Sequence, residues 1–414
     1  MLMQFNCKNF KSYKDEFSLD MSATSITEHS DHVVLLNKGA VTEKLLKVAA
    51  IYGANASGKS NVLEALEHMK FLVKTSFTDA SKRKVIPLKR FSFDEESKNS
   101  TSIFEVYFTY KEEQYQYGFS LDSNKIFEEW LYKRDFRMKE KYTLIFEREF
   151  QKYSLNDSLK DYLPLLNSLS PQTLLLSFLS NIKLPDINNV YDWFSETNII
   201  NFGDPLRDMM AHKILPQECF DEKEDKNEFE KYLNSIDVGI EKIKVEEIPD
   251  SKDEDGNAAY KVFSIHTNNE TKQPESLNLS EESHGTLKMI TLYEPIKNAL
   301  RHGATLLIDE MDAKLHPLLT KYIVNIFFNK EINKKNAQLI FTTHDVVNLT
   351  KELFRRDEIW FVEKNEKNES SLYSLIEYRL DDTKVRKDAS YNKDYLYGRY
   401  GAVPILKEFG MGGE

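Results

Sequence analysis

Residues 51–66 read IYGANASGKSNVLEAL and place Gly53, Gly58, Lys59 and Ser60 at a characteristic spacing. This spacing fits the phosphate-binding loop G-x-x-x-x-G-K-[ST], in which backbone N–H groups surround the phosphates of a nucleotide. A chain of this length would show the pattern by chance in on the order of one case in a hundred. The sequence on either side of the motif therefore has to distinguish a phosphate-binding loop from a chance match.

Both flanks have the periodicity that such a loop requires. Leu45–Tyr52 (LLKVAAIY) is a nearly continuous apolar run, typical of a strand covered on both faces. After the motif, apolar residues recur at helical spacing from Val62 to Val73. A strand, a loop and a helix N-terminus in this order direct unpaired N–H groups and the positive end of the helix dipole at a bound anion. The sequence therefore predicts a nucleotide-binding loop.

Composition limits the class of protein. The chain of 414 residues is 41% hydrophobic and 12% aromatic, enough for extended cores. No apolar stretch approaches the roughly 20 residues of a membrane span, and the first residues lack the features of a signal peptide. Cys7 and Cys219 form no C-x-x-C or His/Cys cluster, so neither a disulfide framework nor a structural zinc site is indicated. We expect a cytoplasmic protein without a membrane partner.

The net charge of −11 is unevenly distributed. Residues 218–255 contain 15 Asp or Glu and 6 Lys, which leaves the remainder of the chain nearly neutral. This balance argues against a generally basic nucleic-acid binder. A local DNA-binding surface stays possible, although no strong Lys/Arg cluster with interleaved aromatics indicates one.

Apolar alternation predicts an antiparallel sheet in the first part of the chain. It occurs in two strands between Met3 and Met21, in a hairpin over 104–121 and in a strand over 142–150. We place this sheet, with the phosphate loop, in a domain of residues 1–153.

A helical lobe is expected over residues 154–240, with Ser170 and Pro171 opening one of its helices. Residues 241–414 would complete the nucleotide-binding domain. They begin with strands over 240–248 and 260–267 around the polar turn 249–257, which we expect to be mobile.

The stretch ATLLIDEMDAKLHP (304–317) supplies the carboxylates that hydrolysis needs. Its apolar strand ends at Asp309, which can hold Mg²⁺ beside the Ser60 hydroxyl, and Glu310 follows at the position of the attacking water. The alternative is a strand end with solvated carboxylates. Together with the phosphate loop, the pair favours an ATPase that turns over.

His344 ends a third apolar stretch, AQLIFTTHD (337–345). At the carboxyl edge of a sheet, an imidazole can bond the γ-phosphate or the lytic water. A structural histidine is the alternative.

The segment ESHGT contains Ser283, a good N-cap for a helix that continues past Pro295 and ends at Gly303. We expect Pro295 to kink this helix. The segment is either a capped helix start or a second helix N-terminus offered to phosphate. One chain cannot easily direct two helix termini at the same γ-phosphate, so the second interpretation requires a second subunit.

The segments NFKSYKDEFSLD, GANASGKSNVLEAL, SHGTLKM, LLIDEMDAKLHP and IFTTHD resemble the ABC-type ATPase heads of the SMC, RecF and OLD group. Through FSFDEES, LFRRDEIWFVEK and YLYGRYGAVP the chain is most similar to AAA-type ATP-binding proteins of abortive-infection and anti-phage operons, such as RloA, AbiL and the ATPase of PARIS systems. The resemblance covers most of the chain. It implies an α/β fold: an ABC/SMC-like P-loop ATPase head with an antiparallel β subdomain and a helical insertion.

The resemblance also implies that ATP and Mg²⁺ lie between two heads of a homodimer or higher homo-oligomer. Nucleotide-binding residues would be, in one subunit, Gly53, Asn55, Gly58, Lys59, Ser60 and Asn61, and in the other, Ser283, Gly285 and Thr286. Ser60 and Asp309 would hold the metal, Glu310 and His344 would be catalytic, and Asp312 would lie in the loop that links the two sites. ESHGT departs from the L-S-G-G-Q signature, and Gln114 and Gln116, in the predicted hairpin, leave the Q-loop glutamine unplaced.

OLD proteins carry a metal-binding nuclease domain after the ATPase. Here Asp381 and Asp382 lack the surrounding carboxylates that a two-metal site requires. We therefore expect a sensor or scaffold ATPase of anti-phage defence that controls a separately encoded toxic effector, such as a nuclease. The alternatives are a DNA repair or maintenance ATPase that clamps DNA and, less favoured by the sequence, a transporter motor.

Overall fold

The computed structural model describes residues 1–38, 41–79, 85–134, 141–204, 224–236, 239–252, 258–380, 383–386 and 388–404. Contacts divide the chain into two units. The first unit comprises Met1–Ile200, Ala299–Met311 and Val324–Glu414, and the second comprises Asn201–Asn298 and Asp312–Ile323. Residues 154–200 of the predicted helical lobe thus belong to the first unit, and the described residues of the lobe after 201 belong to the second.

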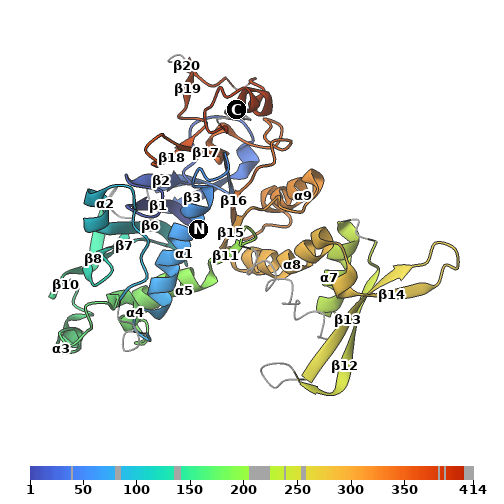
Figure 1. The fold of residues 1–414 in the computed structure, drawn as a ribbon. Coiled ribbons are helices and arrows are strands. Elements are labelled where there is room, and N and C mark those ends of the chain that lie inside the picture. The colour runs from blue at the N-terminus through green and yellow to red at the C-terminus, as the bar shows by residue number, and fades with distance from the viewer. Residues whose placement is uncertain are drawn as a thin grey trace, which may run out of the picture. The chain divides into compact units, whose positions relative to one another are not determined.

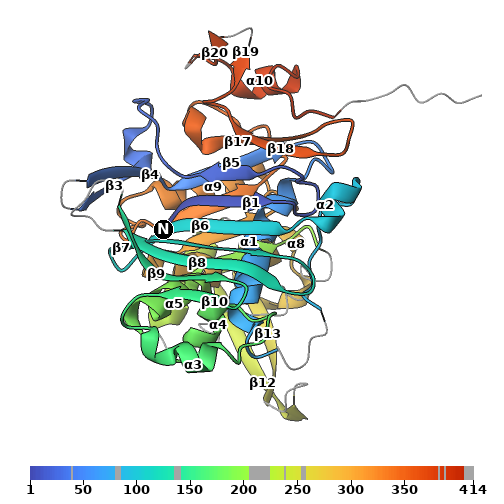
Figure 2. The same cartoon turned by 90° about the vertical axis from the view of Figure 1, so that its left-hand side faces the viewer.

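An antiparallel sheet forms one layer of the first unit, and several of its strands run side by side in Figure 2. Its strands in spatial order are β10 (Lys152–Leu155), β9 (Tyr142–Glu149), β8 (Ile126–Arg134), β7 (Glu113–Leu121), β6 (Ser102–Tyr110), β1 (Leu2–Lys8) and β2 (Phe17–Asp20). The predicted hairpin is confirmed, because β6 pairs with β7 in a register that sets Phe104 opposite Phe119. Alternate residues of β6 are buried, which is why its sequence alternates.

A second sheet of the first unit is mainly parallel. Its order is β11 (Asn198–Asn201), β15 (Thr305–Asp309), β16 (Gln338–Thr342), β5 (Val48–Gly53), β17 (Ile359–Lys364) and β18 (Ser370–Ser374). The strands β15, β16, β5 and β17 are parallel, and β18 is antiparallel to β17. Every residue of β5 is buried, so the apolar run before the loop is a central strand, as predicted. The predicted run 45–52 is nevertheless divided between two strands. Leu45 and Leu46 belong to β4 (Val41–Leu46), which pairs with β3 (Val33–Lys38).

Helix α1 (Lys59–Thr75) follows the loop and contacts both sheets, at β5, β15 and β6, and also the helices α4 and α5 (Figure 1). Its apolar residues from Val62 to Val73 are buried in the main core, as their spacing predicts. The parallel and antiparallel sheets around this helix confirm the predicted α/β class.

Further helices of the first unit are η2 (Lys160–Tyr162), α3 (Leu163–Leu166), α4 (Leu175–Leu179) and α5 (Pro185–Glu196). The predicted helix start at Ser170 and Pro171 is wrong, because these residues form a turn in which Thr173 N–H donates to the Ser170 carbonyl (3.0 Å). Helix α4 begins later because the Glu129 carboxyl group, from the antiparallel sheet, accepts the N–H groups of Leu175 (2.5 Å) and Leu176 (2.9 Å).

The second unit contains α7 (Glu224–Ser235), η4 (Leu279–Glu281) and an antiparallel sheet of β12 (Lys242–Lys252), β13 (Ala258–Thr267) and β14 (Pro274–Asn278). The two predicted strands are confirmed, and β12 extends into the predicted turn, of which residues 253–257 lie outside the described residues. Helix α8 (His284–His302) starts in this unit and continues through Pro295.

Shorter elements complete the description: η1 (Ser30–His32), α2 (Glu95–Asn99), α9 (Pro317–Phe328), η5 (Arg356–Glu358), β19 (Arg379–Leu380), β20 (Thr383–Lys384) and α10 (Tyr391–Leu396). Cys7 is buried in β1, and burial raises the pKa of its thiol, whereas Cys219 lies outside the described residues. In the described part of the chain, no helix combines the length and the apolar character needed to cross a membrane.

Candidate functional site

The phosphate loop joins β5 to α1 and requires both of its motif glycines. A Cβ atom at Gly53 would clash with the carbonyl oxygen of Val362 in the neighbouring strand β17. At Gly58, φ is +112° and a Cβ atom would lie 2.6 Å from the hydroxyl oxygens of Ser12 and Ser370. The two glycines therefore let strand β17 and two serines approach the loop backbone.

The side chains of the loop are suited to phosphate. Lys59 is 6% exposed, and its ammonium group donates to the carbonyl oxygens of Gly53 and Ala54, both at 2.9 Å. The buried hydroxyl of Ser57 has no hydrogen-bond partner among the described residues. Buried polar atoms are normally satisfied, and a phosphate oxygen accepts from both a hydroxyl and an ammonium group. Asn55, also predicted to bind nucleotide, is exposed on the same loop.

Residues far away in sequence hold the loop from outside. Ser370 Oγ of β18 donates to the Ser57 carbonyl (2.5 Å) and lies 2.8 Å from Ser12 Oγ. Asn61, predicted to bind nucleotide, donates its amide to Ser12 Oγ (2.7 Å). Tyr13, whose phenol pKa is raised by burial, donates to the Gly58 carbonyl (3.3 Å). No motif in the sequence indicates this role for Ser12, Tyr13 or Ser370.

The predicted metal ligand lies at the same sheet edge as the loop. Asp309 ends β15, and β15, β16 and β5 are adjacent parallel strands whose carboxyl ends meet there. Asp309 is 3% exposed, and its Oδ1 accepts the Thr342 hydroxyl (2.6 Å). The same hydroxyl oxygen accepts the N–H of Glu310 (2.8 Å). Thr342 thus orients the carboxylate pair, a role that the sequence FTTHD did not reveal.

The Asp309 carboxylate and the Ser60 hydroxyl offer the oxygen ligands that Mg²⁺ prefers. Ser60 stands in the first turn of α1, directly after the phosphate loop. Together with the unpartnered Ser57 hydroxyl, these groups fit a nucleotide phosphate with its magnesium ion.

His344 lies where the sequence predicted, just beyond the carboxyl end of β16, and is exposed. The preceding residue is fixed, since Thr343 N–H donates to the Ile51 carbonyl (3.1 Å). The Asp345 carboxylate accepts from Val347 N–H (2.9 Å) and from the Asn348 amide (2.6 Å). His344 is therefore held at the edge of the sheet by an ordered turn.

The signature-like segment lies in the second unit, at the start of α8. Ser283 Oγ accepts the N–H of Thr286 (3.1 Å), which confirms the predicted N-cap. A Cβ atom at Gly285 would lie 2.9 Å from the Lys314 carbonyl oxygen. Lys288, 1% exposed, donates to the Ala313 carbonyl (2.9 Å). The start of α8 is thus packed against the segment that follows Asp312.

The glutamines considered for a Q-loop have other partners. Gln114 is 3% exposed and donates to the Glu43 carboxylate, and Gln116 donates to Glu105 (2.8 Å). Neither of these bonds involves the phosphate loop.

A pocket of about 600 Å³ adjoins the phosphate loop through Ser12. Its other lining residues are mainly cationic or aromatic: Lys11, Leu88, Lys89, Arg90, Phe91, Ser92, Phe93 and Lys98. The volume is within the range of small-molecule sites, about 300–1,000 Å³. This group was not predicted from the sequence, although LKRFSF at 88–93 interleaves cations with aromatic rings.

Two solved structures are similar over 90% of this chain. The SMC head domain from Thermotoga maritima has a TM-score of 0.42 and 14% identity, with 98% of that chain covered. An SmcHead bound to the C-winged helix domain of ScpA has a TM-score of 0.41 and 15% identity, with 97% of that chain covered.

No curated protein matches the sequence significantly. A family model matches residues 48–349, more than half of the chain and including the phosphate loop, Asp309 and His344. The predicted kinship with AAA-type proteins of abortive infection is thereby confirmed, and the chain belongs to the family described as "AAA domain, putative AbiEii toxin, Type IV TA system".

Proposed function

We propose that the protein binds ATP with Mg²⁺ at this sheet edge and hydrolyses it. The observation that carries the proposal is the Asp309–Thr342–Glu310 arrangement, buried at the carboxyl ends of strands adjacent to the one that leads into the phosphate loop. A phosphate loop alone explains binding, whereas an oriented carboxylate pair beside it serves hydrolysis.

Each residue has a role that its position supports. Lys59 neutralises phosphate charge, and Ser60 and Asp309 hold the metal, which when bound polarises the phosphate oxygens. Glu310 accepts a proton from the attacking water and orients it. Its backbone has φ of +52°, and the Thr342 hydroxyl holds its N–H group (2.8 Å). His344 bonds the γ-phosphate or the lytic water.

The pocket beside the loop receives the base and ribose of the same nucleotide. It starts at Ser12, which touches the loop, and offers the exposed ring of Phe93 together with the cations Lys89 and Arg90. Aromatic and cationic side chains suit the flat base and the α-phosphate.

The protein forms an ATP-bound dimer in which Ser283, Gly285 and Thr286 of one copy cap the γ-phosphate held by the other. The capped, exposed start of α8 supports this assignment, because it offers a hydroxyl and helix N–H groups. In this proposal the nucleotide state holds or releases a separately encoded toxic effector during anti-phage defence, in line with the abortive-infection family.

The Glu310→Gln variant tests hydrolysis. It keeps the shape and the backbone bond of Glu310 but removes the proton acceptor, so we expect unchanged ATP affinity, a loss of turnover and a trapped dimer in light scattering. Glu331→Gln, at an exposed site after α9, is the matched control and keeps the wild-type rate. Normal hydrolysis by Glu310→Gln would contradict the assignment.

A second candidate function, DNA clamping by the dimer, is favoured by the four cations that line the pocket: Lys11, Lys89, Arg90 and Lys98. Binding of duplex DNA that weakens steeply with added salt would support it, because phosphate contacts release counterions. Purification from the native host distinguishes the candidates, since a co-purifying protein supports the effector proposal and DNA alone supports clamping.

A further inference from the structure

One group of side chains outside the nucleotide site has the composition of a transition-metal site. In the part of the chain that the structure describes, His29, Asp31 and His32 are a group whose ligand atoms, one from each residue, lie within 4.8 Å of one another. They belong to η1 and the residue before it, in the first unit. Two imidazoles and a carboxylate form a ligand set that Zn²⁺ uses in proteins.

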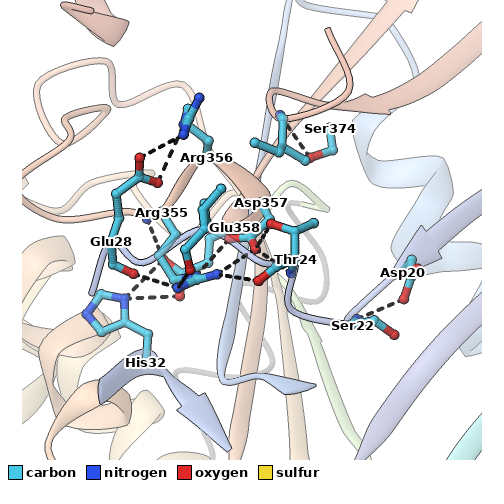
Figure 3. A network of polar contacts seen from close by, with 12 residues as sticks. Asp20, Ser22, Thr24, Glu28, His32, Arg355, Arg356, Asp357, Glu358 and Ser374 are labelled. Carbon is cyan, nitrogen blue, oxygen red and sulfur yellow. Dashed lines mark hydrogen bonds and ion pairs between the residues drawn. The ribbon is translucent and has the colours of Figure 1, made fainter. Parts of the chain in front are cut away.

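Both histidines already have a partner on one ring nitrogen. Nδ1 of His32 lies 3.0 Å from Oε1 of Glu358, a fully buried carboxyl group (Figure 3). Nε2 of His29 lies 2.7 Å from the Lys351 carbonyl, which can only accept, so the proton is on Nε2 and the lone pair on Nδ1. Metal-bound histidines characteristically donate their second ring nitrogen to a carboxylate or a carbonyl. The arrangement leaves one ring nitrogen of each histidine for a cation.

The segment before the cluster is fixed by a network of charged residues, drawn in Figure 3. Arg355 bonds both oxygens of Asp357 (2.8 and 2.7 Å) and donates to the Glu28 carbonyl (2.5 Å). Asp357 accepts the N–H of Thr24 (2.8 Å). The buried Lys47 donates to the carbonyl of Asp31 itself (3.0 Å). These bonds fix the backbone that carries the cluster. The rings of His29 and His32 are stacked, with centroids 4.7 Å and planes 17° apart, so one ring has to turn for both lone pairs to face the same cation.

The location separates this cluster from phosphoryl transfer. Lys47 and Glu358 directly precede the parallel strands β5 and β17, which pair as Ala50 with Ile359. The cluster therefore lies at the amino edge of the sheet, whereas the phosphate loop and Asp309 lie at the carboxyl edge. A cation here has a structural role.

We propose that His29, Asp31 and His32 bind a divalent first-row transition metal, with Zn²⁺ as the best fit and a remaining position for water. The metal fastens the N-terminal segment to η5 and the amino edge of the sheet. The sequence indicated no structural zinc site because the two cysteines form no metal-binding motif. The feature that could have predicted this site is the short spacing H-x-D-H at residues 29–32.

Zinc titration of the full chain, free of any histidine tag and stripped with a chelator, tests the proposal. We expect one equivalent of Zn²⁺ to bind, and millimolar Mg²⁺ not to displace it. The variants His29→Ala and Asp31→Asn change residues that are not fully buried, so both should fold and bind Zn²⁺ at least about tenfold more weakly. His302→Ala, at the exposed end of α8, is the matched control and keeps wild-type affinity.

Thermal melting gives a second readout that is independent of ATP hydrolysis. Zn²⁺ should raise the melting temperature of the wild type and of His302→Ala but not that of Asp31→Asn, while the metal-free proteins melt alike. Substoichiometric zinc in the wild type, or equal zinc affinity in wild type and Asp31→Asn, would overturn the proposal.

Discussion

Replacing Thr342 with valine tests whether one hydroxyl holds the carboxylates of the site. Thr342 is fully buried, and valine has nearly its shape, so the change leaves no cavity. It removes the bond to the Asp309 carboxylate (2.6 Å) and the bond from Glu310 N–H (2.8 Å). A hydrogen bond to a charged group contributes about 1.5–3 kcal/mol and a neutral one about 1 kcal/mol. We therefore expect the free energy of unfolding without nucleotide to fall by roughly 2.5–4 kcal/mol.

The chain contains a matched control for this substitution. Thr320 is 2% exposed, and its hydroxyl has no hydrogen-bond partner among the described residues. Thr320→Val therefore removes a hydroxyl of the same burial without breaking a bond, and we expect it to be neutral or stabilising. Urea unfolding of both variants, followed by tryptophan fluorescence, measures the difference, and steady-state assays should show a lower kcat only for Thr342→Val. Equal destabilisation by the two substitutions would refute the reasoning.

Three further predictions concern the loop, the proposed dimer and the core. Ser370→Ala removes the bond to the Ser57 carbonyl, worth about 1 kcal/mol, so we expect KM for ATP to rise about fivefold in steady-state kinetics while kcat changes little. Ser283→Arg should abolish the ATP-dependent dimer in light scattering and leave ATP binding by calorimetry intact, whereas loss of binding would indicate a role within one subunit. Burial raises the pKa of Glu129, so the folded state holds its proton more tightly than the unfolded state. The stabilisation that this proton binding gives the folded state is fully present below about pH 4.5 and is lost as the pH rises through the folded pKa. In urea titrations, the stability advantage of wild type over Glu129→Gln should therefore shrink with rising pH.

Local pattern predicted the elements that build the site. The apolar spacing after Lys59 gave the buried face of α1, and the alternation around Phe104 gave a hairpin with the correct partners. These features are predictable because burial of one face imposes a period on the sequence itself. The predicted order of strand, loop and helix is the one that the structure has at β5 and α1.

Contacts between distant segments could not be predicted in this way. Ser12 and Ser370 meet at Gly58 only because β17 and β18 extend the parallel sheet beside β5. Helix α4 begins at Leu175 and not at the predicted Ser170, because Glu129, in β8 of the antiparallel sheet, caps it there. Hydrophobic periodicity does not predict such contacts, because each joins residues that only the folded chain brings together.

The folded core extends beyond residues 48–349, the range that the family model matches. Gln338 is fully buried, and its amide bonds the N–H (2.6 Å) and carbonyl (3.0 Å) of Leu2 and the carbonyl of Leu46 (2.9 Å), all outside that range. Removing the flanks would also take β17 away and leave β5 as an open edge, a recognised site of aggregation. We therefore expect a fragment of residues 48–349 to aggregate in size-exclusion chromatography and to bind no ATP. A soluble fragment that binds ATP would show that the flanking strands are dispensable and that the loop does not depend on Ser370.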